Sequence, residues 1–279
     1  VCEAARNVAA VGGVPSAVTD CLNYGNPENP EVFWEFREGV RGVGDACRGI
    51  GLIGEAGHPL PVISGNVSFY NQGKSGRAIP PTPIIACVGV VEDYSRCRSI
   101  AFKQESNEIF LIGTPMDELG GSQYYRIIYD SVGESIPQAD FIRERDQIRS
   151  LLEIYRMDIV KACHDISSGG LITALAEMAV ASPGKLGITV DLSRIEHAGL
   201  PPEKLLFSET GGFILEVSPG HERDILAVCA RNRVRLHKLG RLIPRPRLKV
   251  VSGEERVASW QVADLRKIYM NGCKEIFGK

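Results

Sequence analysis

Hydrophobic and polar positions follow two patterns along the first hundred residues, one typical of strands and one typical of helices. The segments 14–25, 60–70 and 82–93 are rich in β-branched residues and bounded by turn-forming residues, which predicts three strands. Residues 30–51 carry apolar side chains three or four positions apart, the spacing of one buried helix face. That face consists of Val32, Phe36, Val40 and Val43. Residues 1–13 also have a helical pattern, which two glycines end.

The rest of the chain alternates between the same two patterns. Strands are expected at 108–115, 187–193, 211–218 and 234–243. Helices are expected at 143–165, 169–182, 220–232 and 260–273. This mixture predicts an α/β (mixed α+β) fold, and a polar stretch near residue 105 predicts a domain boundary. We therefore expect a strand-rich α/β domain over 1–105 and an α/β sandwich domain over 106–279.

Composition and charge exclude several classes of protein. A net charge of -2 gives no electrostatic reason to expect nucleic acid or an anionic membrane as a partner. No signal peptide or transmembrane run is present, and the 8 cysteines form no C-x-x-C pair, which argues against a structural zinc site. We expect a cytoplasmic protein with reduced thiols. The basic segment 241–250, which Pro244 and Pro246 interrupt, is expected to be a solvated connection.

The first residue carries its own information. The chain opens with Val1 and enters a helical pattern without a methionine, a cap or a preceding element. We therefore expect it to be a segment of a longer protein.

Polar residues crowd the end of the first expected strand, at 20–27. Asp20 and the asparagines that follow it could hold a hydroxyl, a base edge or a metal-bound water. The alternative is an Asx-rich turn whose side chains bind their own backbone. The composition of the segment alone favours the turn.

A second polar group interrupts the strand at 62–71. Alternation puts Val67 and Phe69 on one face and the polar Asn66 and Ser68 on the other. Gly65 would let a ligand approach the backbone closely, and the Asn66 carbonyl is an oxygen that Mg²⁺ accepts. The alternative is a strand with a β-bulge at Gly65.

A third candidate lies at the start of the helix expected at 169–182. Ser167, Ser168, Gly169 and Gly170 would present backbone N–H groups to an anion at the positive end of the helix dipole. The alternative is an ordinary serine cap with glycines for close packing. The chain has neither a G-x-x-x-x-G-K-[ST] loop nor a G-x-S-x-G elbow, which argues against a P-loop enzyme and a serine hydrolase.

Taken in order, five segments of the chain resemble one enzyme family. These segments are 17–36, 61–71, 81–93, 164–179 and 206–217. Together they resemble formylglycinamide ribonucleotide amidotransferase (phosphoribosylformylglycinamidine synthase), a member of the aminoimidazole ribonucleotide synthetase superfamily. The resemblance covers essentially the whole chain and is to the C-terminal half of a synthetase built as a tandem duplication.

The resemblance implies an ATP-dependent ligase of purine biosynthesis. ATP activates the amide oxygen of formylglycinamide ribonucleotide, and ammonia from a glutaminase subunit or domain gives the amidine. It assigns ATP contacts to Asp20 and Gly65, a magnesium ligand to Asn66 and a substrate contact to Ser68. The separation of Asp20 from Gly65 is longer than expected for the family, and segment 48–60 is the expected extra length.

The resemblance also implies what this chain lacks. The catalytic histidine and the carboxylate ligands of magnesium belong to the N-terminal half, so we expect no catalytic residue here and no activity of the isolated chain. The expected partners are that half, the glutaminase and a small accessory subunit, with homodimerisation of the chain through uncovered apolar surface as another expectation. The alternatives are another ATP-dependent enzyme of the superfamily or a non-catalytic nucleotide-binding scaffold half.

Overall fold

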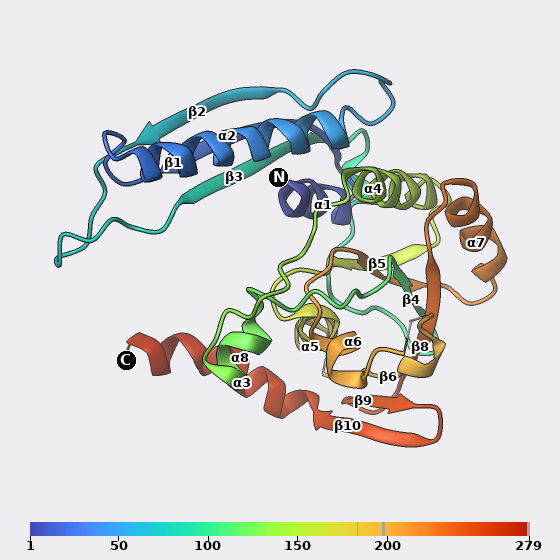
Figure 1. The fold of residues 1–279 in the computed structure, drawn as a ribbon. Helices are drawn as coiled ribbons and strands as arrows, with labels where there is room; N and C mark the ends of the chain where they lie inside the picture. Colours follow the sequence, from blue (N-terminus) through green and yellow to red (C-terminus); the bar gives the residue numbers. More distant parts are fainter. Residues whose placement is uncertain (183, 197–198, 278–279) are drawn as a thin grey trace.

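Two sheets organise the chain in a computed structural model that describes residues 1–277 apart from 183, 197 and 198. In Figure 1 a three-stranded sheet with one long helix lies above a larger sheet that has helices on both faces. The expected mixed α/β class is confirmed. No helix in the part of the chain that the structure describes has the length and apolar character needed to cross a membrane.

The smaller sheet has the strand order β2-β1-β3. β1 (Val14–Asn23) is central, β2 (Val62–Ser68) runs parallel to it and β3 (Thr82–Val90) runs antiparallel. Helix α2 (Pro30–Ile50) covers one face, and its start is fixed because the Asn29 side chain accepts a hydrogen bond from the Glu31 N–H. All three predicted strands and the predicted helix are therefore present.

The larger sheet has seven strands in the order β10-β9-β6-β8-β4-β7-β5. They are β4 (Glu108–Ile112), β5 (Val160–Asp165), β6 (Gly187–Asp191), β7 (Phe213–Val217), β8 (Leu236–Ile243), β9 (Arg247–Ser252) and β10 (Glu255–Gln261). The helices are α1 (Cys2–Ala10), α3 (Gln123–Tyr129), α4 (Phe141–Tyr155), α5 (Gly170–Ala181), α6 (Pro202–Phe207), α7 (Glu222–Arg231) and α8 (Val262–Phe277), with 3-10 turns at Tyr94–Arg96 and Leu192–Arg194.

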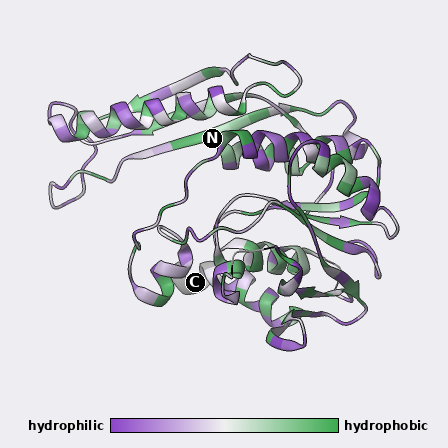
Figure 2. Cartoon of the chain, turned by 45° about the vertical axis from the view of Figure 1, so that its right-hand side comes forward, coloured by the Kyte–Doolittle hydropathy of each residue, from purple (hydrophilic) through white to green (hydrophobic). Residues whose placement is uncertain are grey.

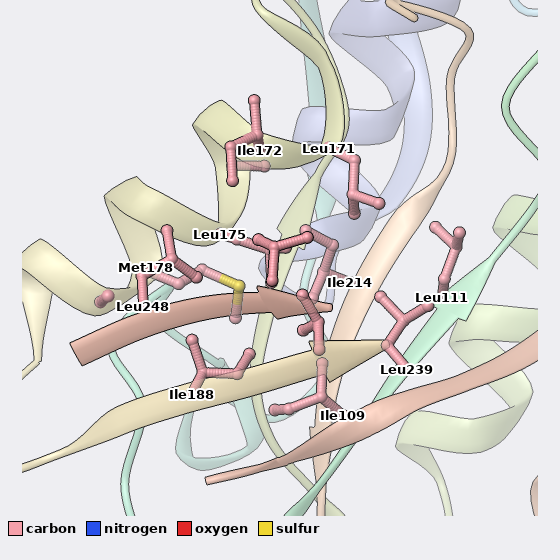
Figure 3. Packing of buried hydrophobic residues seen from close by; sticks show 14 of the residues in the cluster. Ile109, Leu111, Leu171, Ile172, Leu175, Met178, Ile188, Ile214, Leu239 and Leu248 are labelled. Atoms are coloured by element: carbon pink, nitrogen blue, oxygen red, sulfur yellow. The ribbon is translucent and has the colours of Figure 1, made fainter. Parts of the chain in front are cut away.

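Strand β4 shows why this sheet needs helices on both faces. Its side chains alternate between two buried clusters: Ile109 and Leu111 pack with residues of α5, and Phe110 and Ile112 pack with residues of α1, α4 and α7. Figure 3 shows the α5 side of this core, where Leu175 lies over the strands. The predicted sandwich layers are thus built by a strand that is apolar on both faces.

The two sheets share packing through α1. Ala5, Ala9 and Ala10 are buried in the cluster that contains α4 and the strands of the larger sheet, although α1 precedes the smaller sheet in sequence. The predicted boundary near residue 105 falls in the connection between Val90 and Glu108.

Three expectations about the elements are corrected. The helix predicted over 143–165 ends at Tyr155, and Val160–Asp165 is strand β5; Asp158 at φ 56 makes the turn between them. The helix predicted over 260–273 begins at Val262, because the two residues before it end β10. The basic segment 241–250 is not a solvated connection, since Leu242, Leu248 and Val250 are buried parts of β8 and β9.

Candidate functional site

The register of β1 and β2 brings the predicted site residues of the first two motifs together. Asp20 pairs with Gly65, Cys21 pairs with Asn66, and Asn23 pairs with Ser68. Residues paired in register on neighbouring strands point to the same face of a sheet, and successive residues point to opposite faces. The four predicted residues therefore form two pairs on opposite faces of the sheet.

Asp20 and Gly65 lie on the face that α2 covers. Asp20 also pairs with Ile85 of β3. Ile85 packs against a buried cluster that includes Val18 of β1 and Cys47 of α2. A Cβ atom at position 65 would overlap Oδ1 of Asp20, so the glycine leaves room for this carboxylate. The carboxylate is half-buried and has no hydrogen-bond partner among the described residues. It is thus a partly buried acceptor whose hydrogen-bonding capacity is unused within the described chain.

Asn66 and Ser68 lie on the opposite face, beside Cys21 and the 57% exposed Ile84. Asn66 has no hydrogen-bond partner within the described ranges, whereas Oγ of Ser68 lies 3.1 Å from Nδ2 of Asn71. The same Asn71 amide donates to the Ser68 carbonyl at 2.9 Å. Asn71 therefore positions Ser68, a role that the sequence pattern did not reveal because the contact depends on the turn after β2.

The alternative of a β-bulge at Gly65 is wrong. The register with β1 is continuous from Ser64 to Ser68, and the irregularity lies at Ile63, which is skipped between Val62 and Ser64. Gly65 is thus part of the regular ladder, and the space taken by Asp20 explains the glycine there.

The residues present do not make a self-contained magnesium site. Asp20 and Asn66 lie on opposite faces, so they do not share one ion. The part of the chain that the structure describes holds no group of three or more His, Cys, Asp or Glu side chains placed to bind a metal. Asn66 alone offers one neutral oxygen, whereas Mg²⁺ in proteins usually has carboxylate and phosphate oxygens around it.

The asparagines after Asp20 support the turn interpretation. Oδ1 of Asn26 accepts from the Glu28 N–H at 2.8 Å, and the amide of Asn23 donates to the Cys21 carbonyl at 3.1 Å and the Thr82 carbonyl at 3.2 Å. The side chains of Asn23 and Asn26 therefore form hydrogen bonds with backbone groups of the turn and of the neighbouring strand. Asp20 is the polar group of this segment that remains for a ligand.

An internal carboxylate lies at the start of α5, where an anion contact was predicted. The Gly169 N–H donates to Oε1 of Glu209 at 2.8 Å, and the same oxygen accepts from the Gln123 N–H at 2.9 Å. Gly170, at φ 70, packs so closely on Leu206 to Ser208 that a Cβ atom would lie 2.7 Å from their backbone. The glycines thus serve close packing. Glu209 lies on the connection between α6 and β7, and its contact with the start of α5 was not predicted from the sequence.

A cleft of about 500 Å³ separates the smaller sheet from the helices and loops of the larger one. Its upper wall includes Pro83 and Ile85 of β3, and Ile85 is the neighbour of Asp20. Its other wall includes Arg6, whose Nη1 lies 2.7 Å from Oε2 of Glu144, and Glu209. The Asp20 side of the smaller sheet therefore borders a cleft of ligand size.

His164 forms a charged cluster between β5 and α5, outside the cleft lining. Its Nε2 lies 2.9 Å from Glu177 and its Nδ1 lies 3.2 Å from Asp165, which the Asn7 amide nitrogen of α1 also approaches at 2.9 Å. Burial lowers the pKa of the imidazole, but the hydrogen bonds to the two carboxylates outweigh burial and raise this pKa to about 9. The ring is cationic at neutral pH and links three elements.

Two family descriptions match the chain in order. Residues 1–91 match the AIR synthase related protein, N-terminal domain, and residues 104–253 match the AIR synthase related protein, C-terminal domain. The second match alone spans more than half of the chain. The chain belongs to the AIR synthase related family.

Curated relatives of this AIR synthase related chain confirm the more specific resemblance. The phosphoribosylformylglycinamidine synthase subunit PurL of Methanothrix thermoacetophila is 46% identical over 229 residues, covering 82% of this chain and 29% of the relative. The PurL subunit of Thermobifida fusca is 39% identical over 278 residues, covering 99% of this chain and 34% of the relative. The chain thus spans about a third of the length of these relatives.

Solved structures of PurL from T. maritima share the fold. The structure of T. maritima PurL complexed with ATP matches with a TM-score of 0.73 at 20% identity, over 95% of this chain and 40% of that one. The structure complexed with FGAR matches with a TM-score of 0.74 at 21% identity, over 95% and 42%. At this identity the likeness concerns the fold alone.

Proposed function

We propose that the chain forms one wall of the active site of an ATP-dependent ligase that makes formylglycinamidine ribonucleotide. The observation that carries the proposal is the half-buried, unpartnered Asp20 carboxylate, which lies beside Gly65 and is paired with Ile85 of the cleft wall. The names of the relatives and the ATP and FGAR complexes of T. maritima PurL support the same assignment. In this proposal Asp20 and the Gly65 backbone contact ATP, and Ser68, which lies on the opposite face of the same sheet from Asp20, is the contact for the ribonucleotide.

The reaction is a phosphoryl transfer followed by displacement. The amide oxygen of formylglycinamide ribonucleotide attacks the γ-phosphorus of ATP, releasing ADP and forming an iminophosphate. Ammonia adds to the activated carbon, and inorganic phosphate leaves as the amidine forms. Such chemistry depends on positioning and on cations near the transferred group. The residues of this chain serve the first requirement, and a glutaminase subunit or domain supplies the ammonia.

Magnesium enters this proposal only as an ion shared with another part of the enzyme. Asn66 would be one neutral ligand, and the carboxylate ligands would come from the N-terminal half, since the described residues include no group of three or more His, Cys, Asp or Glu side chains placed to bind a metal. The isolated chain is therefore proposed to be inactive.

The open face of the smaller sheet is the proposed contact surface for that N-terminal half. Ile84, Val88 and Val90 of β3 are 57%, 52% and 58% exposed on it. Figure 2 shows hydrophobic segments, in green, along the strands of this sheet. In the absence of the other half, a second copy of the chain is the proposed substitute. A small accessory subunit is a further proposed partner of the whole enzyme.

A nucleotide-binding scaffold role centred on Ser167, Ser168, Gly169 and Gly170 has less support. Glu209 already accepts from the Gly169 N–H, so a phosphate there would have to displace a carboxylate. Repulsion between the two anions makes this exchange unfavourable.

The test replaces the matched segment of the M. thermoacetophila subunit with this chain and measures amidine formation by the resulting chimera. We expect the chimera to be active and Asp20→Asn to lower its kcat/KM for ATP roughly 10- to 100-fold, because a charged acceptor is lost. Asp130→Asn, an exposed position without an ion pair in the described chain, is the matched control. Unchanged kcat/KM for ATP in the Asp20→Asn chimera would contradict the proposal.

A further inference from the structure

The segment 51–60, which connects α2 to β2, is an organised loop. The Leu52 N–H donates to the His58 carbonyl at 2.8 Å, and the Leu60 N–H donates to the Cys47 carbonyl at 2.9 Å, so both ends are fixed to α2 and to each other. The loop includes most of the length that was expected to be additional in this chain. Its Leu52 and Leu60 pack with Val18 of β1 in the small core beneath α2.

Helix α4 of the larger sheet lies directly beside the loop. A Cβ atom on Gly49 of α2 would overlap the ring of Phe141, so the two helices touch at the first turn of α4. Residues four apart on a helix share a face. Arg145 and Arg149 therefore continue the face that Phe141 begins, and both line a pocket under the loop.

This pocket has a volume of about 590 Å³, within the range of small-molecule sites. Its lining combines basic side chains with an apolar wall from the loop. The basic members are Arg48, Arg145, Arg149 and His58, and the apolar ones include Ile50, Leu52 and Pro59. Glu55 is the acidic residue that lines it.

The arginines of this pocket are only partly neutralised. Arg48 lies 2.6 Å from Asp45, and Nε of Arg145 lies 3.4 Å from its sequence neighbour Asp146. Arg149 is exposed and forms no ion pair within the described ranges. The loop also has unused backbone donors, because the N–H groups of Gly54, Ala56 and Gly57 donate to no acceptor among the described residues. The pocket therefore offers an excess of donors and positive charge.

We propose that this pocket binds a small phosphorylated molecule. Guanidinium groups recognise phosphate oxygens through paired hydrogen bonds, with Arg149 as the free member and Arg145 beside it. The apolar wall of Leu52 and Pro59 accommodates an organic part, so the ligand class is a phosphate ester such as a nucleotide or a sugar phosphate. The site is separate from the β1–β2 site and does not depend on the proposed function.

The test is titration calorimetry of the 279-residue chain at low salt with AMP, ribose 5-phosphate and adenosine. We expect the two phosphate esters to bind with an affinity that salt weakens, and adenosine not to bind at this pocket. Tighter binding of AMP than of ribose 5-phosphate would identify a nucleotide as the ligand; equal binding would identify a sugar phosphate.

Substitutions assign the signal to the pocket. Arg149→Gln is expected to weaken binding about tenfold or more, and Glu55→Gln is expected to tighten it by removing the acidic group. The control is Arg223→Gln on α7, an exposed arginine without an ion pair in the described chain. The proposal is overturned if neither ester binds, or if Arg149→Gln leaves the affinity unchanged. Neither result bears on Asp20.

Discussion

At the scale of single residues, Asp20 and Gly65 act as one unit. A glycine in the middle of a regular ladder is unfavourable for a strand, yet here any side chain would collide with the Asp20 carboxylate. The sequence suggested a ligand as the reason for the glycine. The structure supplies a reason within the chain itself, which is the space that the Asp20 side chain occupies beside Gly65.

Gly65→Ala is therefore expected to lower the free energy of unfolding by about 1 kcal/mol, because the Asp20 side chain has to leave its rotamer to make room for the new methyl group. Asp20→Ala should restore most of this loss in the double variant, since the colliding group is gone. Urea unfolding of the four proteins measures the coupling. Gly73→Ala is the control, because a Cβ there would have its nearest neighbour at 3.9 Å. If the effects of the two substitutions on the free energy of unfolding are additive, Asp20 is not the reason for the glycine at position 65.

At the scale of elements, sequence patterns identified the helices and strands with a clear period. β1, β2 and β3 were predicted from their β-branched residues and the turns around them, and α2 from the spacing of its apolar side chains. Strand β5 was missed because its residues Val160–Asp165 continue the apolar pattern of the preceding helix, and a short strand apolar on both faces has no period of its own.

The candidate site was predictable to a similar extent. Asp20 and Gly65 were singled out from residue type and order, and the structure places them next to each other. Asn71 and Glu209 were not identified, since their roles depend on which backbone groups a turn or a distant helix brings within reach. Contacts between distant segments are not encoded in local patterns.

The His164 cluster makes an element-scale prediction, because it joins β5 to α5. Its folded pKa of about 9 lies above the ordinary value of 6.5, so protonation stabilises the fold. This contribution is fully present below pH 6.5 and is lost as pH rises through 9. The native chain is expected to have a larger free energy of unfolding than His164→Asn at pH 6.5. We expect on the order of 2 kcal/mol of this difference to disappear as pH rises through 9. The measurement is the free energy of unfolding of both proteins from pH 6 to 10. A difference that stays constant over this range would contradict the stabilising role of the protonated ring.

At the scale of the whole molecule, the arrangement in Figure 1 shows how a chain that spans about a third of its relatives' length builds one connected structure. Helix α1 packs into the core of the larger sheet, and the smaller sheet is joined to it through α1 and through α2 against α4. One face of the smaller sheet remains open and apolar. Asn66 and Ser68 lie on this open face, so a partner that covers the face would complete their surroundings.

The most direct test of this account is the initial rate of amidine formation by the 279-residue chain alone. The assay contains formylglycinamide ribonucleotide, ATP, Mg²⁺ and ammonium at saturating concentrations. We predict no turnover above the background without protein, because the described residues hold no group of three or more His, Cys, Asp or Glu side chains that could bind a metal. Robust ATP-dependent turnover would contradict the claim that this chain is one wall of a shared site.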